Sequence, residues 1–214
     1  MHARFWENTD EVAWAPLFSE DGAMYQPLIE SGAPQVMANW SHLMPDTLKN
    51  NMDRGKASYP KIAAALGELP MTLIHGDSRI ENVAFDGEMP RFYDCQLTSR
   101  GPAAYDLMYF LKQSMDVDLK RQHQDMLLDA YLKRLNDAGV KYTMAALLDD
   151  LALASCTVWG FTALVGNLVL PSEVNSRLLE ATLPRYSGVI DGFGGLAKLD
   201  SISTFMIKNL GDRR

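Results

Sequence analysis

Three oxygen-bearing side chains occur within a short stretch of the sequence and could do chemistry together. Asn82 follows Asp77 after five residues, and Asp94 follows Asn82 after twelve. Phosphoryl transfer needs a carboxylate that receives the proton of the acceptor hydroxyl, and oxygen ligands that hold Mg²⁺ on the phosphates. An aspartate, an asparagine five residues later and a further aspartate can supply these groups. We therefore predict a phosphoryl-transfer centre that uses Mg²⁺ at these three positions.

A β-hairpin is predicted to bring the third of these side chains back to the second. Residues 83–85 and 91–95 are short apolar segments on either side of Asp86-Gly87, a dipeptide that favours tight hairpin turns. Pairing of the two segments would place Asp94 alongside Asn82. The hairpin is thus the element that would assemble the metal site.

The remainder of the chain is predicted to be mostly helical. Residues 71–75 form an apolar run of strand length, whereas residues 10–34 read as loops because prolines and glycines interrupt them. Apolar residues recur at helical spacing in most other segments. The predicted helices cover residues 2–8, 35–52, 58–68, 104–115, 117–138, 143–168 and 172–190. The predicted fold class is α+β, mainly helical, with a small β-hairpin at the active site.

Composition and charge exclude several classes of protein. Of the 214 residues, 47% are hydrophobic and 22% are charged, which is typical of a globular domain. The net charge of −7 argues against a nucleic-acid partner, which would require a basic surface. Cys95 and Cys156 are far apart and are predicted to be free thiols of a cytoplasmic protein. The uncharged residues 151–170 lack flanking basic residues, so we expect a buried core helix and no membrane partner.

The motifs around the three side chains resemble a known family. The tripeptide His-Gly-Asp at residues 75–77, Asn82, and the Tyr-Asp pair at residues 93–94 match aminoglycoside phosphotransferases and their relatives, which include choline, macrolide and ecdysteroid kinase-like proteins. Residues 101–107 (GPAAYDL) are similar to the segment that follows the metal-binding aspartate in that family. The likeness covers residues 1–196.

The resemblance implies a role for each motif residue. Asp77 would be the catalytic base. Asn82 and Asp94 would bind Mg²⁺ and, through it, ATP. His75 and Asp106 would be structural supports. The implied reaction transfers the γ-phosphate of ATP to a hydroxyl group of a small-molecule substrate.

The resemblance also implies that residues 1–196 correspond to the C-terminal, catalytic lobe of a protein-kinase-like fold. Residues 73–110 would carry the catalytic loop and metal site, residues 104–190 would form the acceptor side, and residues 197–214 are unassigned. The glycine-rich loop and strand lysine that grip nucleotide in complete kinases are not found ahead of the His-Gly-Asp motif. We expect the isolated chain to bind ATP weakly, and a separate N-terminal lobe polypeptide or self-association to complete the site.

Several residues also have simpler interpretations. Arg79 is a candidate for a phosphate or substrate contact, or for a structural ion pair. Taken alone, Asp77 would fit a turn cap and Asp94 a solvated hairpin residue. Trp6 and Trp14 are expected on the surface that a second lobe would cover. The alternative function is a catalytically inactive binding or interaction protein that retains the kinase C-lobe fold.

Overall fold

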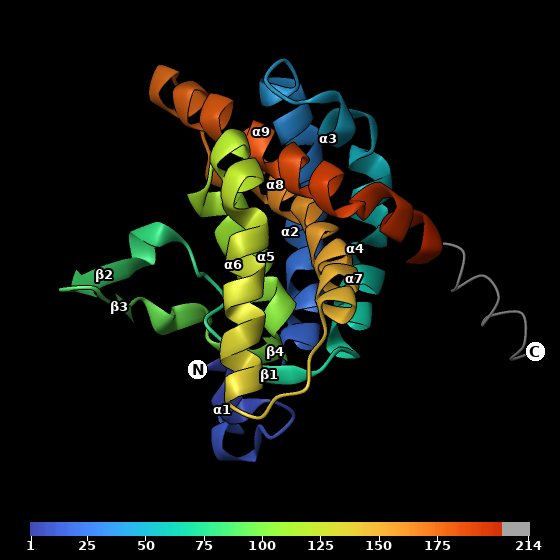
Figure 1. The fold of residues 1–214 in the computed structure, drawn as a ribbon. Coiled ribbons are helices and arrows are strands. Elements are labelled where there is room, and N and C mark those ends of the chain that lie inside the picture. The colour runs from blue at the N-terminus through green and yellow to red at the C-terminus, as the bar shows by residue number, and fades with distance from the viewer. Residues whose placement is uncertain (203–214) are drawn as a thin grey trace, which may run out of the picture.

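The computed structural model describes residues 1–202, without the side chains of residues 21–23. Helices form most of this region, and its strands are short (Figure 1). The helices are α1 (His2–Phe5), α2 (Phe18–Trp40), α3 (Asp46–Asn50), α4 (Met52–Gly67), α5 (Ala103–Ser114), α6 (Val117–Asp137), α7 (Met144–Ser155), α8 (Val158–Leu168) and α9 (Glu173–Phe193). The strands are β1 (Met71–Ile74), β2 (Val83–Asp86), β3 (Met89–Phe92) and β4 (Ser99–Pro102). The mainly helical architecture with a small antiparallel β-element is therefore confirmed.

Helix α2 occupies much of the segment that was predicted to be loop. It contains Pro27 and Pro34, each of which removes a backbone donor from the helix. Its packing against α8 is very close: a β-carbon on Gly32 would lie 2.2 Å from the carbonyl oxygen of Ala163, and one on Gly166 would lie 2.0 Å from that of Gly32. The loop prediction was wrong from residue 18 onward, because these glycines allow two helix backbones to touch and tertiary packing outweighs local propensity.

The apolar segment predicted as one helix over residues 143–168 is two helices. α7 ends at Ser155 and α8 begins at Val158. The stretch Met144–Leu168 is long and apolar enough to cross a membrane, but 67% of its most apolar window is buried inside the protein. Burial on most sides is typical of a core helix in a globular domain, so this segment gives no support for a membrane span.

Helix α5 runs through the centre of the helical body and supports the loop that contains the predicted site. It packs against α7 and α9 and also contacts β1. The core around it includes the fully buried side chains of Trp40, Met108 and Trp159. Because the first turn of α5 carries Asp106, a helix that packs in the core holds a charged side chain next to the predicted site.

Two antiparallel strand pairs frame the loop that contains the predicted site. β1 pairs with β4 from Met71↔Pro102 to Ile74↔Ser99. This pairing was not predicted, because glycine and proline disfavour strands. β2 pairs with β3 from Val83↔Phe92 onward, as predicted, and forms a hairpin that projects from the helical body (Figure 1).

Three smaller predictions also differ from the structure. α1 ends at Phe5 instead of residue 8, and the predicted helix over residues 35–52 is divided between the end of α2 and α3. Residues 195–202 are helical, with Leu199 buried. The unassigned tail at residues 197–214 therefore begins within a helix, and its remainder, residues 203–214, lies outside the described residues.

Candidate active site

The loop between β1 and β2 holds Asp77 in a buried position. Gly76 has a φ of +83°, and a β-carbon there would lie 2.1 Å from the carbonyl oxygen of Leu97, so this position requires glycine. Asn82 Nδ2 donates to Asp77 Oδ2 and to the Asp77 main-chain oxygen, both at 2.9 Å. Asp77 Oδ1 has no hydrogen-bond partner among the described residues. One oxygen of this buried carboxylate is thus unpaired within the described part of the chain.

Asp106 ties this loop to helix α5. The amides of His75 and Gly76 donate to its two carboxylate oxygens at 2.7 and 2.9 Å. The Ser78 hydroxyl donates to the main-chain oxygen of Asp106 at 2.7 Å. All four residues are buried. A carboxylate that accepts hydrogen bonds from two main-chain amides fixes the backbone of the loop. Asp106 therefore lies where a structural support of the loop would lie.

His2 extends this network to the N-terminus. Its Nε2 lies 3.1 Å from Asp106 Oδ2, and its Nδ1 lies 3.0 Å from the Tyr131 hydroxyl. Thr72 donates its hydroxyl to the His2 carbonyl at 2.7 Å. No role for His2 was predicted from the sequence, because its partners Asp106 and Tyr131 lie far away along the chain.

His75 links the loop to the end of the hairpin. Its Nε2 lies 2.9 Å from the carbonyl oxygen of Tyr93, and its Nδ1 accepts the Asp77 amide at 3.2 Å. A carbonyl can only accept, so these two partners assign the proton to Nε2 and make the ring neutral. With both nitrogens engaged inside the protein, His75 occupies the position of a support rather than of a base.

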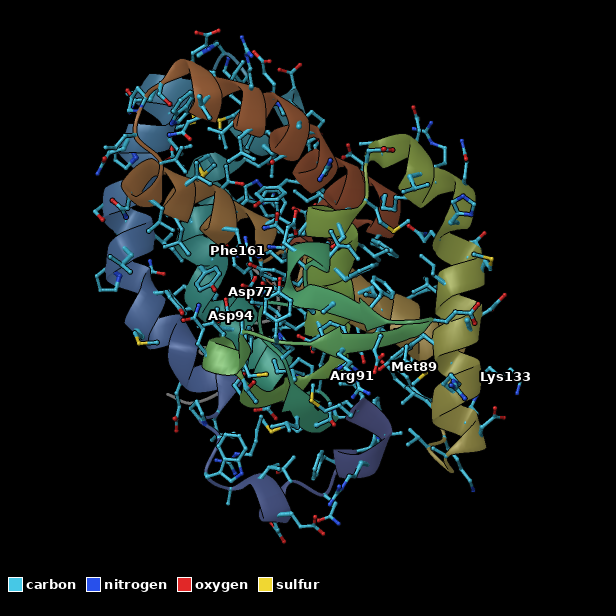
Figure 2. The ribbon with its side chains drawn as sticks, turned by 90° about the vertical axis from the view of Figure 1, so that its left-hand side faces the viewer. Asp77, Met89, Arg91, Asp94, Lys133 and Phe161 are labelled. Carbon is cyan, nitrogen blue, oxygen red and sulfur yellow. The ribbon has the colours of Figure 1, made fainter. Side chains whose placement is uncertain are left out.

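The backbone of Tyr93 places Asp94 next to the loop. The Tyr93 amide donates to the carbonyl oxygen of Asn82 at 3.1 Å. Asp94 itself has a left-handed backbone, with a φ of +59°, and an exposed side chain. In Figure 2, Asp94 and Asp77 lie at neighbouring positions in the view. The hairpin therefore returns the chain beside Asn82.

The predicted Mg²⁺ ligands are Asn82 and Asp94, an amide and a carboxylate. Within residues 1–202, no three His, Cys, Asp or Glu side chains form a group that could hold a metal ion. Asn82 uses its Nδ2 atom for hydrogen bonds to Asp77, which leaves its oxygen available. Mg²⁺ commonly binds through one or two carboxylates together with substrate phosphates and water. The two ligands Asn82 and Asp94 therefore fit a Mg²⁺ ion that is also bound by nucleotide phosphates. They do not fit a site in which the protein alone supplies all the ligands.

Arg79 lies beside the candidate base. Its Nε atom is 3.5 Å from Asp77 Oδ2, and 45% of its side chain is exposed. The ion-pair alternative is therefore present in the structure. Because an arginine has five donors and only one side of this guanidinium faces Asp77, the exposed part can still meet an anionic ligand.

An aromatic cavity of about 280 Å³ opens beside the loop at Gly76. Its walls come from helices α2, α4, α5, α8 and α9. The aromatic lining includes Tyr59, Tyr105, Tyr109, Phe161 and Tyr186. Burial, and next the negative charge of Asp77, raise the pKa of Tyr109 far above its usual range. Burial also raises the pKa of Tyr186, to about 12. Both hydroxyls therefore remain protonated donors at neutral pH.

A buried lysine behind this cavity was missed by sequence reasoning. Lys112 lies on α5 and is 1% exposed. Its Nζ atom lies over the rings of Tyr109 and Phe161, at 4.2 and 3.1 Å from their centroids. Nothing in the local sequence separates Lys112 from a surface lysine, because Phe161 is far away along the chain.

Comparison with known proteins identifies the family. The sequence model of the ecdysteroid kinase-like family matches residues 19–142, which is more than half of the chain. The chain belongs to this family. No curated protein matches it. The matched region of this ecdysteroid kinase-like chain contains the loop with Asp77, the hairpin and Asp106, and the family indicates kinase-like phosphotransferase chemistry. α7, α8 and α9, and with them Phe161 and Tyr186, lie beyond the matched residues.

Proposed function

We propose that this chain is the catalytic lobe of an ATP-dependent small-molecule kinase, which transfers a γ-phosphate to a substrate hydroxyl. The observation that carries the proposal is the buried Asp77 carboxylate, whose Oδ1 has no hydrogen-bond partner among the described residues and whose neighbour Gly76 lines an aromatic cavity. A general base must keep one oxygen available for the proton that it receives. The family membership makes phosphoryl transfer the reaction that such a base would serve.

In this proposal, the protein contributes position and charge. Asp77 accepts the proton of the acceptor hydroxyl, and Asn82 holds the Asp77 carboxylate in place through its 2.9 Å hydrogen bond. Asn82 and Asp94 would hold Mg²⁺, which neutralises charge on the phosphates. Arg79, half exposed beside Asp77, is proposed to contact the phosphoryl group. His75 and Asp106 keep the loop rigid through the hydrogen bonds to its amides.

A second polypeptide surface is proposed to cover the hairpin and complete the nucleotide site. β2 and β3 form a two-stranded sheet, and a hairpin of two strands is marginally stable by itself. It exposes large apolar side chains: Phe85 at 63%, Met89 at 66% and Phe92 at 51%. Trp14, at 72%, adds to the exposed apolar surface, whereas Trp6 packs on Tyr142 with ring centroids 4.9 Å apart. Exposed apolar surface of this kind suits an N-terminal lobe or a second copy of the chain.

Phosphorus NMR of ATP with Mg²⁺ and a panel of small alcohols would test this function. The chain should be tagged and isolated under mild conditions, together with any partner that it retains. We expect a new phosphate ester signal that depends on both Mg²⁺ and the alcohol. Asp77→Asn should lower the rate at least about a hundredfold, because a positioned base typically contributes that much.

Asp86→Asn provides a matched control. Asp86 lies in the same segment but is exposed and pairs with Arg91 at the hairpin. This variant should transfer phosphate at the wild-type rate. Full activity of Asp77→Asn would remove Asp77 from the mechanism. Asp94→Asn should raise the Mg²⁺ concentration required for half-maximal rate, and an unchanged Mg²⁺ dependence would remove Asp94 from the metal site.

The exposed hairpin also favours the second candidate, an inactive interaction protein. In that case a partner would bind over Phe85 and Phe92 without any phosphate transfer. Co-purification of a partner that is lost in Phe85→Ser, combined with no Asp77-dependent transfer by the complex, would establish this alternative and reject the first.

A further inference from the structure

The aromatic cavity beside the loop that contains Asp77 is larger than a packing gap. Its volume is about 280 Å³, whereas close-packed protein interiors contain few voids larger than a water molecule. The rings of its walls pack against one another. The centroid of Tyr105 lies 4.3 Å from that of Phe18 and 6.2 Å from that of Phe161. Phe161 also meets Tyr109 edge to face, at 5.4 Å. Walls that brace one another in this way keep a space for a ligand.

The lining of this cavity is uncharged. None of the described residues that line it has a charged side chain. Burial raises the pKa of Tyr105, Tyr109 and Tyr186, so their hydroxyls keep their protons at neutral pH. A charged ligand would lose its water there and gain no counter-charge. The Lys112 amine already lies over the rings of Phe161 and Tyr109, so a ligand cation could not use these two ring faces. The lining therefore favours a neutral ligand.

One buried polar group of the lining has no partner. Ser99 lines the cavity and is 2% exposed, and its Oγ atom has no hydrogen-bond partner among the described residues. Its backbone is already engaged, because Ser99 pairs with Ile74 where β4 lies against β1. A buried hydroxyl without a partner is uncommon in folded proteins and calls for an explanation. Because Ser99 borders the cavity, a polar group of a ligand there can supply the missing donor or acceptor.

We propose that the cavity binds a neutral molecule with a single ring, and that the Ser99 hydroxyl hydrogen-bonds a polar substituent of that ring. The volume sets the size of the ligand. An apolar cavity of roughly 150 Å³ holds one benzene molecule, so a cavity of about 280 Å³ accommodates one ring with a short substituent. A flat ring suits aromatic walls, because it can stack on them or meet them edge to face.

This binding site is independent of phosphate transfer. Gly76 lines the cavity next to the proposed base Asp77, so a bound ring would lie against the backbone of that loop in a kinase. In an inactive interaction protein, the same cavity would still bind the ring. Phe161 and Tyr186 come from helices beyond the family match, so the choice of ligand depends on this chain's own C-terminal helices. A binding measurement without ATP therefore tests this inference separately from the proposed function.

Four single-ring probes test the preference for a neutral ligand. Benzyl alcohol and benzamide are neutral, whereas benzoate is an anion and benzylamine is a cation at neutral pH. Saturation-transfer NMR with the full chain and no ATP would give the four dissociation constants. We expect about a millimolar or below for the neutral probes, and at least about tenfold weaker binding of both ions. Equal or tighter binding of either ion, or no saturable binding of the neutral probes, would overturn the proposal.

Leu164→Trp tests whether the probes bind in this cavity. Leu164 lines the cavity from α8 and is half-buried, so a larger side chain there can fill the space. This variant should bind both neutral probes at least about tenfold more weakly. Leu148→Trp is the matched control, because Leu148 is exposed on α7 and lies outside the lining, and it should bind them as the wild type does. Unchanged binding in Leu164→Trp would contradict the assignment. If that variant does not fold, Val165→Phe fills the same cavity.

Ser99→Ala tests the proposed hydrogen bond. It should weaken benzyl alcohol binding by about threefold to tenfold, because one hydrogen bond is lost. The melting temperature should stay the same or rise, because the hydroxyl has no partner within the described chain. Ser155→Ala should do the opposite: its buried Oγ donates to the carbonyl oxygen of Ala152 at 2.8 Å, so stability should fall while probe affinity is unchanged. Wild-type affinity for benzyl alcohol in Ser99→Ala would reject Ser99 as a binding residue.

Discussion

The catalytic loop and the β2–β3 hairpin carry the two halves of one proposed site, yet they are built very differently. The loop is buried and is tied to α5 by Asp106, with His75 and Asn82 engaged on either side of Asp77. The hairpin projects from the body (Figure 1). Behind it lies a cavity of about 590 Å³ that is lined by Phe92, among other residues. The proposed base, Asp77, is therefore held in place within the folded chain, whereas the side chain of Asp94 at the end of the hairpin is exposed.

This difference indicates which interactions the folded chain supplies and which it leaves to others. Buried amides such as those of His75 and Gly76 must be satisfied for the protein to fold, so the loop is stabilised from within. The hairpin gains little from burial, because nearly all of its side chains are exposed. Its order should therefore depend on Mg²⁺, nucleotide or a covering surface.

Cysteine labelling should show the contrast most strongly. Cys95 directly follows the hairpin and is exposed, whereas Cys156 is buried in the core. Burial raises the pKa of the Cys156 thiol to about 12, so its thiolate fraction at pH 8 is roughly a thousandfold below that of an ordinary cysteine. We expect a disulfide reagent to label one thiol in the native protein and two in denaturant. Rapid labelling of both thiols in the native protein would show that the reagent reaches Cys156 and that the core around it is not closely packed.

Removal of Asp106 should produce the largest loss of stability. Asp106→Ala would leave the amides of His75 and Gly76 without acceptors, which should lower the free energy of unfolding by about 4 kcal/mol. Urea denaturation followed by circular dichroism measures this change. Asp86→Ala, on the exposed hairpin, should cost less than about 0.5 kcal/mol. Similar costs for the two variants would contradict the view that the loop is internally braced.

Two glycines with positive φ angles test the same contrast at the backbone. Gly76→Ala should cost about 3 kcal/mol, because the new methyl group would meet the carbonyl oxygen of Leu97. Gly87→Ala, in the hairpin turn, has no atom within 4 Å of the added group, so only the backbone strain of about 1 kcal/mol is expected. Thermal unfolding of both variants gives the comparison, and equal shifts in melting temperature would be evidence against it.

The smallest effect is expected at the exposed ion pair of the hairpin. Arg91 lies 2.9 Å from Asp86, and both side chains are 70% exposed. Because solvent screens such pairs, Arg91→Ala should change the free energy of unfolding by less than about 0.5 kcal/mol. A loss above about 1 kcal/mol would show that the hairpin is more strongly coupled to the body than its exposure indicates.

Local patterns predicted the part of the molecule that local interactions control. The β2–β3 hairpin follows from a turn dipeptide between two short apolar segments, and its open end returns the chain to Asn82. Helices α5, α6 and α9 were predicted to within a few residues because their apolar spacing and end signals are clear. The predictions failed at α2 and at the break between α7 and α8, where packing between distant segments decides the backbone.

The sequence by itself determined the order and spacing of Asp77, Asn82 and Asp94, and with them the family and the expected chemistry. Only the tertiary structure decided that Lys112 would be buried without a polar partner, and that His2 would reach Asp106. The physical reason is that spacing along the chain determines hairpin register and helix faces. Burial and charge pairing depend instead on which distant segments pack together, as Phe161 and Tyr186 do around Lys112.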